Sequence, residues 1–125
     1  GYGEFMWEIA GEAMEGSYWI NHVAPEDPAM QPFFAAYKEK YNDECKEFVN
    51  GVLGYDAIYW IADAIKRAGQ ADPKLVRDAL ASTKDLKLHH ATITIDPKDN
   101  NPVDKDGIVL IAKDGKGQFF KKVKP

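Results

Sequence analysis

The stretch from Leu53 to Gly69 constrains the fold more than any other part of the chain. Its apolar residues recur at helical spacing on one face, namely Tyr55, Ile58, Ile61, Ala62, Ile65 and Ala68. Lys66 and Arg67 stand in the last turn, where the helix dipole favours cations, and Gly69 is suited to leave a helix with positive φ. The sequence therefore predicts one long helix that ends at Gly69.

The rest of the chain divides into further helices and strands. Asp72-Pro73 has the N-cap and first-turn residues of a helix over 73–82, and Asp27-Pro28 begins another that ends before Asn42. A first helix is predicted over 4–13. Strands are predicted over 17–23, 92–95, 108–111 and 118–123, with a turn at 114–117, a connector at 84–90 and a loop at 96–106. Residues 44–51 read either as a loop or as a frayed helix start.

This order of elements predicts an α/β domain with helices packed on a mixed sheet and a C-terminal β-hairpin. The run Ile108–Ile111 is continuously apolar, which favours a central strand. The chain has 125 residues, enough for one domain core. Its net charge is −4 and its only basic cluster is Lys121, Lys122 and Lys124, so nucleic acid is not expected as a partner. No apolar run approaches the length of a membrane span.

Catalytic and metal-binding patterns are weak. Cys45 is the only cysteine and is interpreted as an incidental surface residue. His89 and His90 are neighbours on an extended stretch, so their side chains are expected on opposite faces, as a solvated pair and not a metal site. Asp56 is expected near a helix start, where the dipole alone favours an acid. We therefore expect no enzyme activity, no cofactor and no metal.

Several segments carry a resemblance to a known family. They are Ile9–Gly16, the set Phe34, Tyr37, Lys38 and Tyr41, the segments Gly54–Gly69, Asp72-Pro73 and Val76–Leu80, Ile93–Pro97, Asn100–Pro102 and Lys113–Gly115. In this order they resemble the C-terminal portion of leucine/isoleucine/valine-type (branched-chain amino acid) solute-binding proteins of ABC importers, which have the type I periplasmic binding fold. The chain departs from the family at Ala91, where a glycine is usual.

The resemblance implies a division of the chain and a ligand site. Residues 1–20 would belong to lobe two, 21–90 to lobe one and 91–125 to the closing strands, and the whole would be the C-terminal fragment of a two-lobed secreted protein. A loop before the long helix would supply ligand contacts, which map onto Phe48, Asn50 and Gly51, with Tyr55 behind them. The acid that holds the ligand's ammonium group would fall at or before Gly1, with Glu4 a weak substitute.

The implied function is capture of a small solute, an amino acid or a related carboxylate, between two lobes and its delivery to an ABC permease. Localisation would be periplasmic or extracellular, either free or with a lipid anchor in the preceding part. The fragment alone is expected to form a homodimer or another assembly, and not to bind ligand with physiological affinity. Two alternatives stay open: a stand-alone ligand-sensing or protein-interaction domain of the same fold, and an enzyme of flavodoxin-like architecture.

Overall fold

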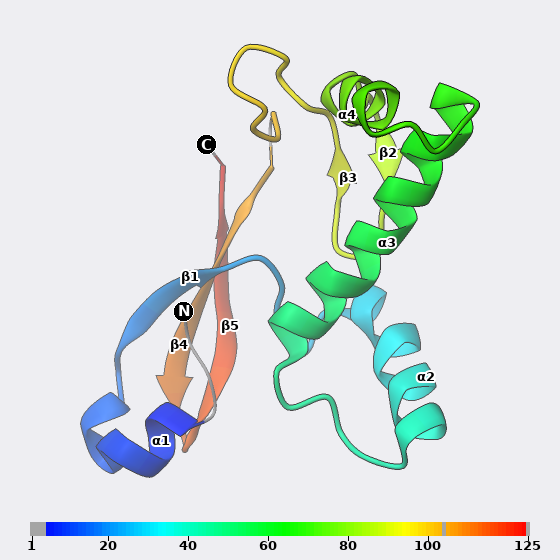
Figure 1. The fold of residues 1–125 in the computed structure, drawn as a ribbon. Coiled ribbons are helices and arrows are strands. Elements are labelled where there is room, and N and C mark those ends of the chain that lie inside the picture. Colours follow the sequence, from blue (N-terminus) through cyan, green and yellow to red (C-terminus); the bar gives the residue numbers. More distant parts are fainter. Residues whose placement is uncertain (1–4, 104, 125) are drawn as a thin grey trace. The chain divides into compact units, whose positions relative to one another are not determined.

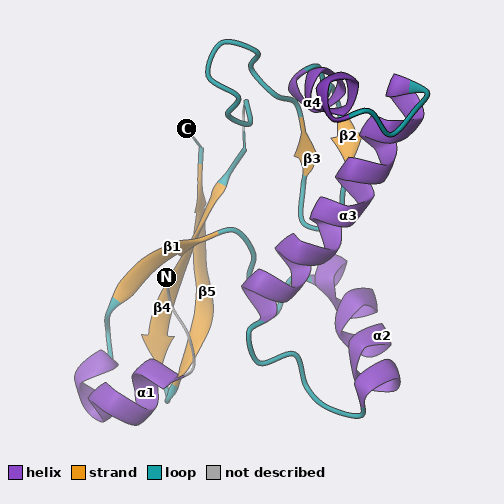
Figure 2. Cartoon of the chain, viewed as in Figure 1, coloured by secondary structure: helices purple, strands orange, loops and turns teal. Residues whose placement is uncertain are grey.

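The structure is a computed structural model that describes residues 5–103 and 105–124. Contacts divide the chain into two compact units: residues 1–52 with 106–125, called unit 1 here, and residues 53–105, called unit 2. Figures 1 and 2 show helices and strands in both, so the predicted α/β class is confirmed. No helix in the described ranges is long and apolar enough to cross a membrane.

Unit 1 is built on a three-stranded sheet with the order β1-β4-β5 (Figure 2). Its strands are β1 (Tyr18–Asn21), β4 (Gly107–Lys113) and β5 (Lys116–Val123). Strand β4 lies in the centre, as its continuous apolar run predicted. A two-residue turn joins β4 to β5: Asp114 and Gly115 have φ of 53° and 75°, which fits a tight hairpin turn. The predicted C-terminal β-hairpin is therefore confirmed.

The prediction of a mixed sheet is wrong for the described strands. Strand β1 pairs with β4 antiparallel, with Tyr18 opposite Ile111, and β4 pairs with β5 antiparallel. Strands β2 (Leu86–Lys87) and β3 (Thr92–Ile93) form a second, antiparallel pair. Short turns join β4 to β5 and β2 to β3, and a short turn can only connect antiparallel neighbours.

The helices of unit 1 follow the capping residues of the sequence. Helix α1 (Phe5–Ala10) is followed by a 3₁₀ turn over Gly11–Met14. A second 3₁₀ turn, Pro28–Met30, leads into α2 (Gln31–Tyr41). The Asp27 carboxylate caps this 3₁₀ turn by accepting a hydrogen bond from the Ala29 N–H. Asn42 ends α2 in the left-handed conformation with φ of 52°. The predicted start and end of this helical stretch are confirmed.

Two apolar clusters hold unit 1 together. Val23, Met30, Phe33 and Val52 form the first, and Ala24, Ile108 and Leu110 form the second, with Trp19 packed against it. Cys45 is half-buried against the first cluster, so its interpretation as a surface residue is wrong. Burial, followed by the charge of Glu47, raises the pKa of the Cys45 thiol. Cys45, in the segment between α2 and α3, is thus a packing residue.

Helix α3 (Phe48–Ala68) begins in unit 1 and continues into unit 2, and α4 (Pro73–Ala81) follows it. The Asp72 carboxylate accepts from the backbone N–H of Lys74 and Leu75, which confirms the predicted N-cap of α4. Gly69 has a φ of 77°, as expected of the residue that ends α3. The stretch predicted as a connector contains β2, because Leu86 and Lys87 pair with β3.

The face of α3 that carries the apolar repeat is largely exposed. Ile58 is 66% exposed, and Ile61 and Tyr55 are exposed as well. The buried positions of α3 are Val52, Asp56 and Ala64, about one turn and two turns apart. The repeat predicted the helix correctly, but it did not identify the side that packs against the rest of this chain.

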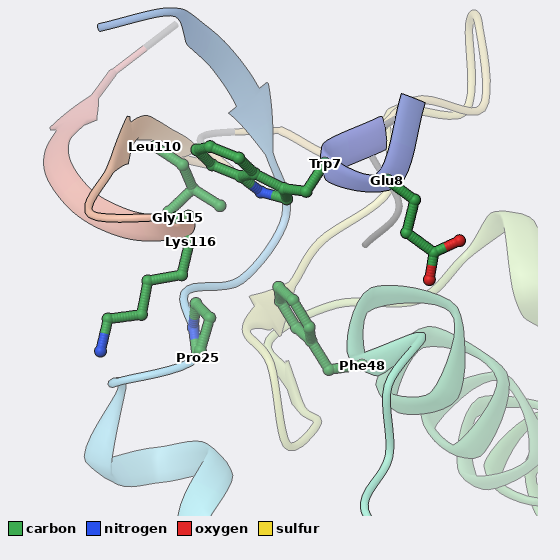
Figure 3. Close-up of a pocket in the computed structure, with 8 residues that line it drawn as sticks. Trp7, Glu8, Pro25, Phe48, Leu110, Gly115 and Lys116 are labelled. Atoms are coloured by element: carbon green, nitrogen blue, oxygen red, sulfur yellow. The ribbon is translucent and has the colours of Figure 1, made fainter. Parts of the chain in front are cut away.

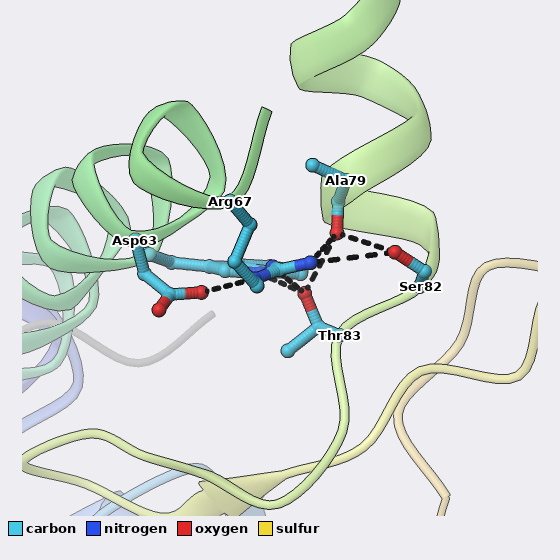
Figure 4. A network of polar contacts seen from close by, with 6 residues as sticks. Asp63, Arg67, Ala79, Ser82 and Thr83 are labelled. Atoms are coloured by element: carbon cyan, nitrogen blue, oxygen red, sulfur yellow. Dashed lines mark hydrogen bonds and ion pairs between the residues drawn. The ribbon is translucent and has the colours of Figure 1, made fainter. Parts of the chain in front are cut away.

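Arg67 joins α3 to the end of α4 (Figure 4). Its guanidinium donates to the Asp63 carboxylate at 2.7 Å, to the Ala79 carbonyl and to the Thr83 hydroxyl at 2.9 Å. The indole N–H of Trp60 donates to the same hydroxyl at 2.7 Å. Thr83 is buried, and its hydroxyl accepts from an N–H of each of these two side chains inside unit 2.

Candidate functional site

A pocket of about 410 Å³ lies within unit 1 (Figure 3). Its walls are apolar and partly aromatic, and one acidic and one basic residue stand beside them; the lining residues are Trp7, Glu8, Pro25, Phe48, Leu110, Gly115, Lys116 and Gly117. Small-molecule sites in proteins combine apolar walls with a few polar groups in this way. The pocket can therefore hold a small solute with an apolar part.

Four elements bring these residues together. Trp7 and Glu8 come from α1, Leu110 from β4, and Lys116 from the start of β5. Phe48 is the first residue of α3, and its ring lies edge-on to that of Phe34 at 6.4 Å between centroids. Phe48 is held by the packing of α2 against the start of α3, which makes it a fixed wall of the pocket.

The four predicted ligand residues lie on α3 and not in a loop before it. The helix begins at Phe48, so the choice left open for residues 44–51 is decided in favour of helix for the last part of that range. Phe48 lines the pocket and Asn50 is exposed. Gly51 is half-buried, and a Cβ added to it would lie 2.6 Å from the Cys45 Sγ. These three belong to unit 1.

Tyr55, the fourth predicted residue, belongs to unit 2. Its ring lies 5.0 Å from that of Tyr59 and 4.9 Å from the imidazole of His89, and its hydroxyl is 3.1 Å from the Tyr59 hydroxyl. Tyr59 and His89 are 5.2 Å apart, so the three rings form one cluster, called the ring cluster here. Glu4 and Gly1, named for the ammonium-binding position, lie outside the described residues.

The sequence did not predict the buried hydrogen-bond cluster that Asp56 forms with His89 and His90 in unit 2. Asp56 is 1% exposed, and each of its carboxylate oxygens accepts two hydrogen bonds from one histidine. Oδ1 accepts from the backbone N–H of His89 at 3.0 Å and faces its Nδ1 at 2.6 Å. Oδ2 accepts from the backbone N–H of His90 at 2.9 Å and faces its Nδ1 at 2.5 Å.

Two opposing effects act on the pKa of Asp56. Burial alone would raise it, but the hydrogen bonds from His90 and His89 together outweigh burial and hold the pKa below its ordinary value. Lys105 is attracted to the same carboxylate, although burial, the larger effect, lowers the pKa of Lys105. Asp56 is therefore an ionised carboxylate at neutral pH, surrounded by donors.

The expectation of a solvated histidine pair with side chains on opposite faces is wrong. Both rings turn toward Asp56, and the His90 side chain is only 7% exposed. Asp56 lies more than two turns inside α3, so the helix start does not account for it. A signal was present, because Asp56 falls one turn after Val52 and two turns before Ala64, on the face that is buried.

The turn between β2 and β3 also explains the departure at Ala91. Leu88 donates its backbone N–H to the Ala91 carbonyl at 2.9 Å, which closes the turn that carries His89 and His90. Ala91 is not among the residues with positive φ, so this turn does not need a glycine there. Among the described residues, no three His, Cys, Asp or Glu side chains are placed to hold a metal ion.

Comparisons with known proteins agree with this architecture. The profile of a family described as "Periplasmic binding protein" matches residues 1–116. The leucine-, isoleucine-, valine-, threonine- and alanine-binding protein of Pseudomonas aeruginosa is 37% identical over 73 residues, which are 58% of this chain and 19% of that protein.

Two solved structures extend the likeness to nearly the whole chain. The leucine-binding protein of Thermotoga maritima is 32% identical with a TM-score of 0.81, covering 98% of this chain and 35% of that one. A branched-chain amino acid transporter substrate-binding protein of Streptococcus pneumoniae, in complex with isoleucine, is 30% identical with a TM-score of 0.77, again covering 98% and 35%. The chain thus spans about a third of the length of these structures.

The fold and these matches define the class as solute-binding proteins with the type I periplasmic binding fold. The chain belongs to the periplasmic binding protein family. The resemblance stated from the sequence is confirmed. The relatives that match are solute-binding proteins and not enzymes, and their family is named for the periplasm.

Proposed function

We propose that this chain is the C-terminal part of the substrate-binding component of an ABC importer for an amino acid or a related carboxylate, of branched-chain type. One observation carries the proposal: 98% of the chain superposes on an isoleucine-bound relative at 30% identity. The aromatic pocket of unit 1 supports it, because Trp7 and Phe48 offer walls suited to an aliphatic side chain.

Phe48, Asn50, Gly51 and Tyr55 are the proposed ligand contacts. Phe48 has direct support, since it lines the pocket, while the other three rest on the family resemblance. The division into lobe two (1–20), lobe one (21–90) and closing strands (91–125) remains part of the proposal. The complete receptor would close its lobes around the solute and present it to the permease without turning it over.

The proposal extends to the place and state of the protein. The complete protein works in the periplasm or outside the cell, either free or held by a lipid anchor. The isolated chain binds no ligand with useful affinity, because most of the receptor's length is missing from it, and it forms homodimers through its uncovered apolar faces.

Calorimetry on the protein at its full natural length tests the function. L-leucine, L-isoleucine and L-valine are expected to bind, with L-lysine as a comparison that does not. Phe48→Ala is expected to weaken binding by roughly 10-fold or more, the effect of removing a large apolar contact. Phe5→Ala is the matched control, since Phe5 is an exposed aromatic residue outside the pocket lining.

Binding of none of the tested amino acids would contradict the ligand class. If, in addition, the full-length gene encoded no first lobe, the stand-alone ligand-sensing or protein-interaction domain would replace the receptor as the best-supported function. Equal affinities of the wild type and Phe48→Ala would leave the receptor function in place and remove Phe48 from the ligand contacts.

A further inference from the structure

The contacts of Asp56 determine where the protons of two histidines lie. An ionised carboxylate can only accept hydrogen bonds, so an Nδ1 atom 2.5–2.6 Å from an Asp56 oxygen must carry a proton. In the neutral form of His89 and His90 the proton is thus on Nδ1, and Nε2 bears the lone pair. The two backbone N–H groups that donate to the same oxygens hold both rings at this distance.

His89 connects this buried carboxylate to the exposed side of α3. Its side chain is 35% exposed, and its ring meets those of Tyr55 and Tyr59 edge-on at 4.9 and 5.2 Å. Edge-to-face contacts between rings favour one orientation over others. The position of the ring cluster therefore depends on the orientation of the His89 imidazole, which depends in turn on Asp56.

We propose that Asp56 is a positioning residue: by holding His89 and His90 as Nδ1–H tautomers it fixes the β2–β3 turn on α3 and sets the place of the Tyr55–Tyr59–His89 ring cluster. Its effect on the ligand rests on the proposed function, because Tyr55 is a proposed ligand contact. The role of Asp56 in fixing the tautomers and the rings does not depend on that function.

Acid can add a proton to this arrangement at two kinds of site, the imidazoles and the carboxylate. An imidazole that takes up a second proton does so at Nε2. This leaves the Nδ1–H donor in place and makes the ring positively charged, which strengthens its hydrogen bond to the carboxylate. Only protonation of Asp56 itself removes an acceptor. The groups around the carboxylate are His89 and His90 from the turn, Lys105, and the Tyr55 hydroxyl on α3, which is paired with that of Tyr59. The ring cluster is thus retained in mildly acidic solution.

Nitrogen NMR of the full-length protein with ¹⁵N-labelled histidine tests the proposal directly. In their neutral form, both His89 and His90 are expected to show a protonated Nδ1 and an unprotonated Nε2. Cross-relaxation between the His89 ring and the rings of Tyr55 and Tyr59 is expected to persist as the pH is lowered from 8 to 5. Signals of Nε2–H tautomers for both histidines would overturn the proposal without any variant.

Asp56→Asn supplies the second arm. An amide has one acceptor oxygen and one NH₂ donor, so one histidine should keep Nδ1–H and the other should switch to Nε2–H. The contacts of His89 with the two tyrosines should weaken. Asp63→Asn is the matched control, because Asp63 lies on the same helix and pairs with Arg67 outside the ring cluster. Unchanged tautomers and ring contacts in Asp56→Asn would overturn the positioning role.

The proposed effect of Asp56 on ligand binding is tested separately, by measuring affinity. The affinity of the full-length Asp56→Asn variant for L-isoleucine should fall by roughly 2- to 30-fold, the range for substitutions that act at a distance. Asp63→Asn should bind like the wild type. Normal affinity together with altered ring contacts would overturn the ligand step alone. Failure of the wild type to bind L-isoleucine would count against the proposed function, while the NMR result still decides the positioning role.

Discussion

The indole N–H of Trp60 donates to the hydroxyl of Thr83 at 2.7 Å, across 23 positions of the sequence. The same hydroxyl accepts from Arg67 at 2.9 Å, and Thr83 is buried. This one oxygen connects the middle of α3, its last turn and the second residue after α4 inside unit 2.

Thr83→Val is expected to lower the free energy of unfolding by about 1–3 kcal/mol, because valine keeps the shape of the side chain but leaves the part-buried donors of Trp60 and Arg67 without this acceptor. Urea unfolding measures the change. Ser82→Ala is the control and should change stability by less than about 0.5 kcal/mol, since Ser82 is exposed. Trp60→Phe in the Thr83→Val background should cost less than in the wild type; equal costs would show that the two residues act independently.

The stability that Asp56 provides should decrease only in acidic solution. Its pKa in the folded protein lies below the unfolded value of 3.8. Its contribution is therefore complete above that value and is lost as the pH falls through the folded pKa. Asp56→Ala should lower the unfolding free energy by about 3–5 kcal/mol at pH 7, and the difference from the wild type should shrink only below about pH 4. A difference that shrinks between pH 8 and 5 would contradict this assignment.

Two glycines in regular structure should respond in opposite ways to alanine. Gly54 lies in α3 with nothing within 4 Å of an added Cβ, so Gly54→Ala should stabilise the protein by about 0.5–1 kcal/mol. At Gly117 in β5 the added Cβ would lie 2.7 Å from Cζ2 of Trp19, which packs on buried core residues. Gly117→Ala should therefore cost about 1–3 kcal/mol. Thermal unfolding of both variants, side by side, measures the contrast.

The uncovered face of the unit 1 sheet should drive self-association of the isolated chain. Ile20 is 75% exposed on β1, and the exposed rings of Tyr18 and Phe120 meet at 5.0 Å on the same sheet. Ile20→Lys should shift the chain toward monomer in sedimentation equilibrium, because a charge on such a face is costly to bury. Ile20→Val, which keeps the face apolar, should associate like the wild type. A monomeric wild type would contradict the proposed homodimer.

Local residue chemistry was enough to predict most of the elements. The Asp27 and Asp72 caps and the helix ends at Asn42 and Gly69 depend on contacts within a few residues, and each was found where the sequence placed it. The turn predicted at 114–117 is shorter, since β5 already begins at Lys116. The resemblance to the family also came from the sequence, since it rests on the order of short motifs. Phe48 was named as a ligand contact from that resemblance, and the structure places it in a pocket wall.

What the sequence did not determine depends on residues far apart in the chain. The position of Asp56 relative to His89 and His90, the antiparallel pairing of β1 with β4, and the exposed face of α3 all follow from how elements pack. An apolar repeat specifies a helix, but the partner that covers it lies elsewhere in the protein. The sequence by itself determined the helices, the turns and the family, because their signals are local. Only the tertiary structure decided that Asp56, at a buried position of α3, binds His89 and His90. A buried charge is stable only where folding supplies hydrogen-bond donors to it.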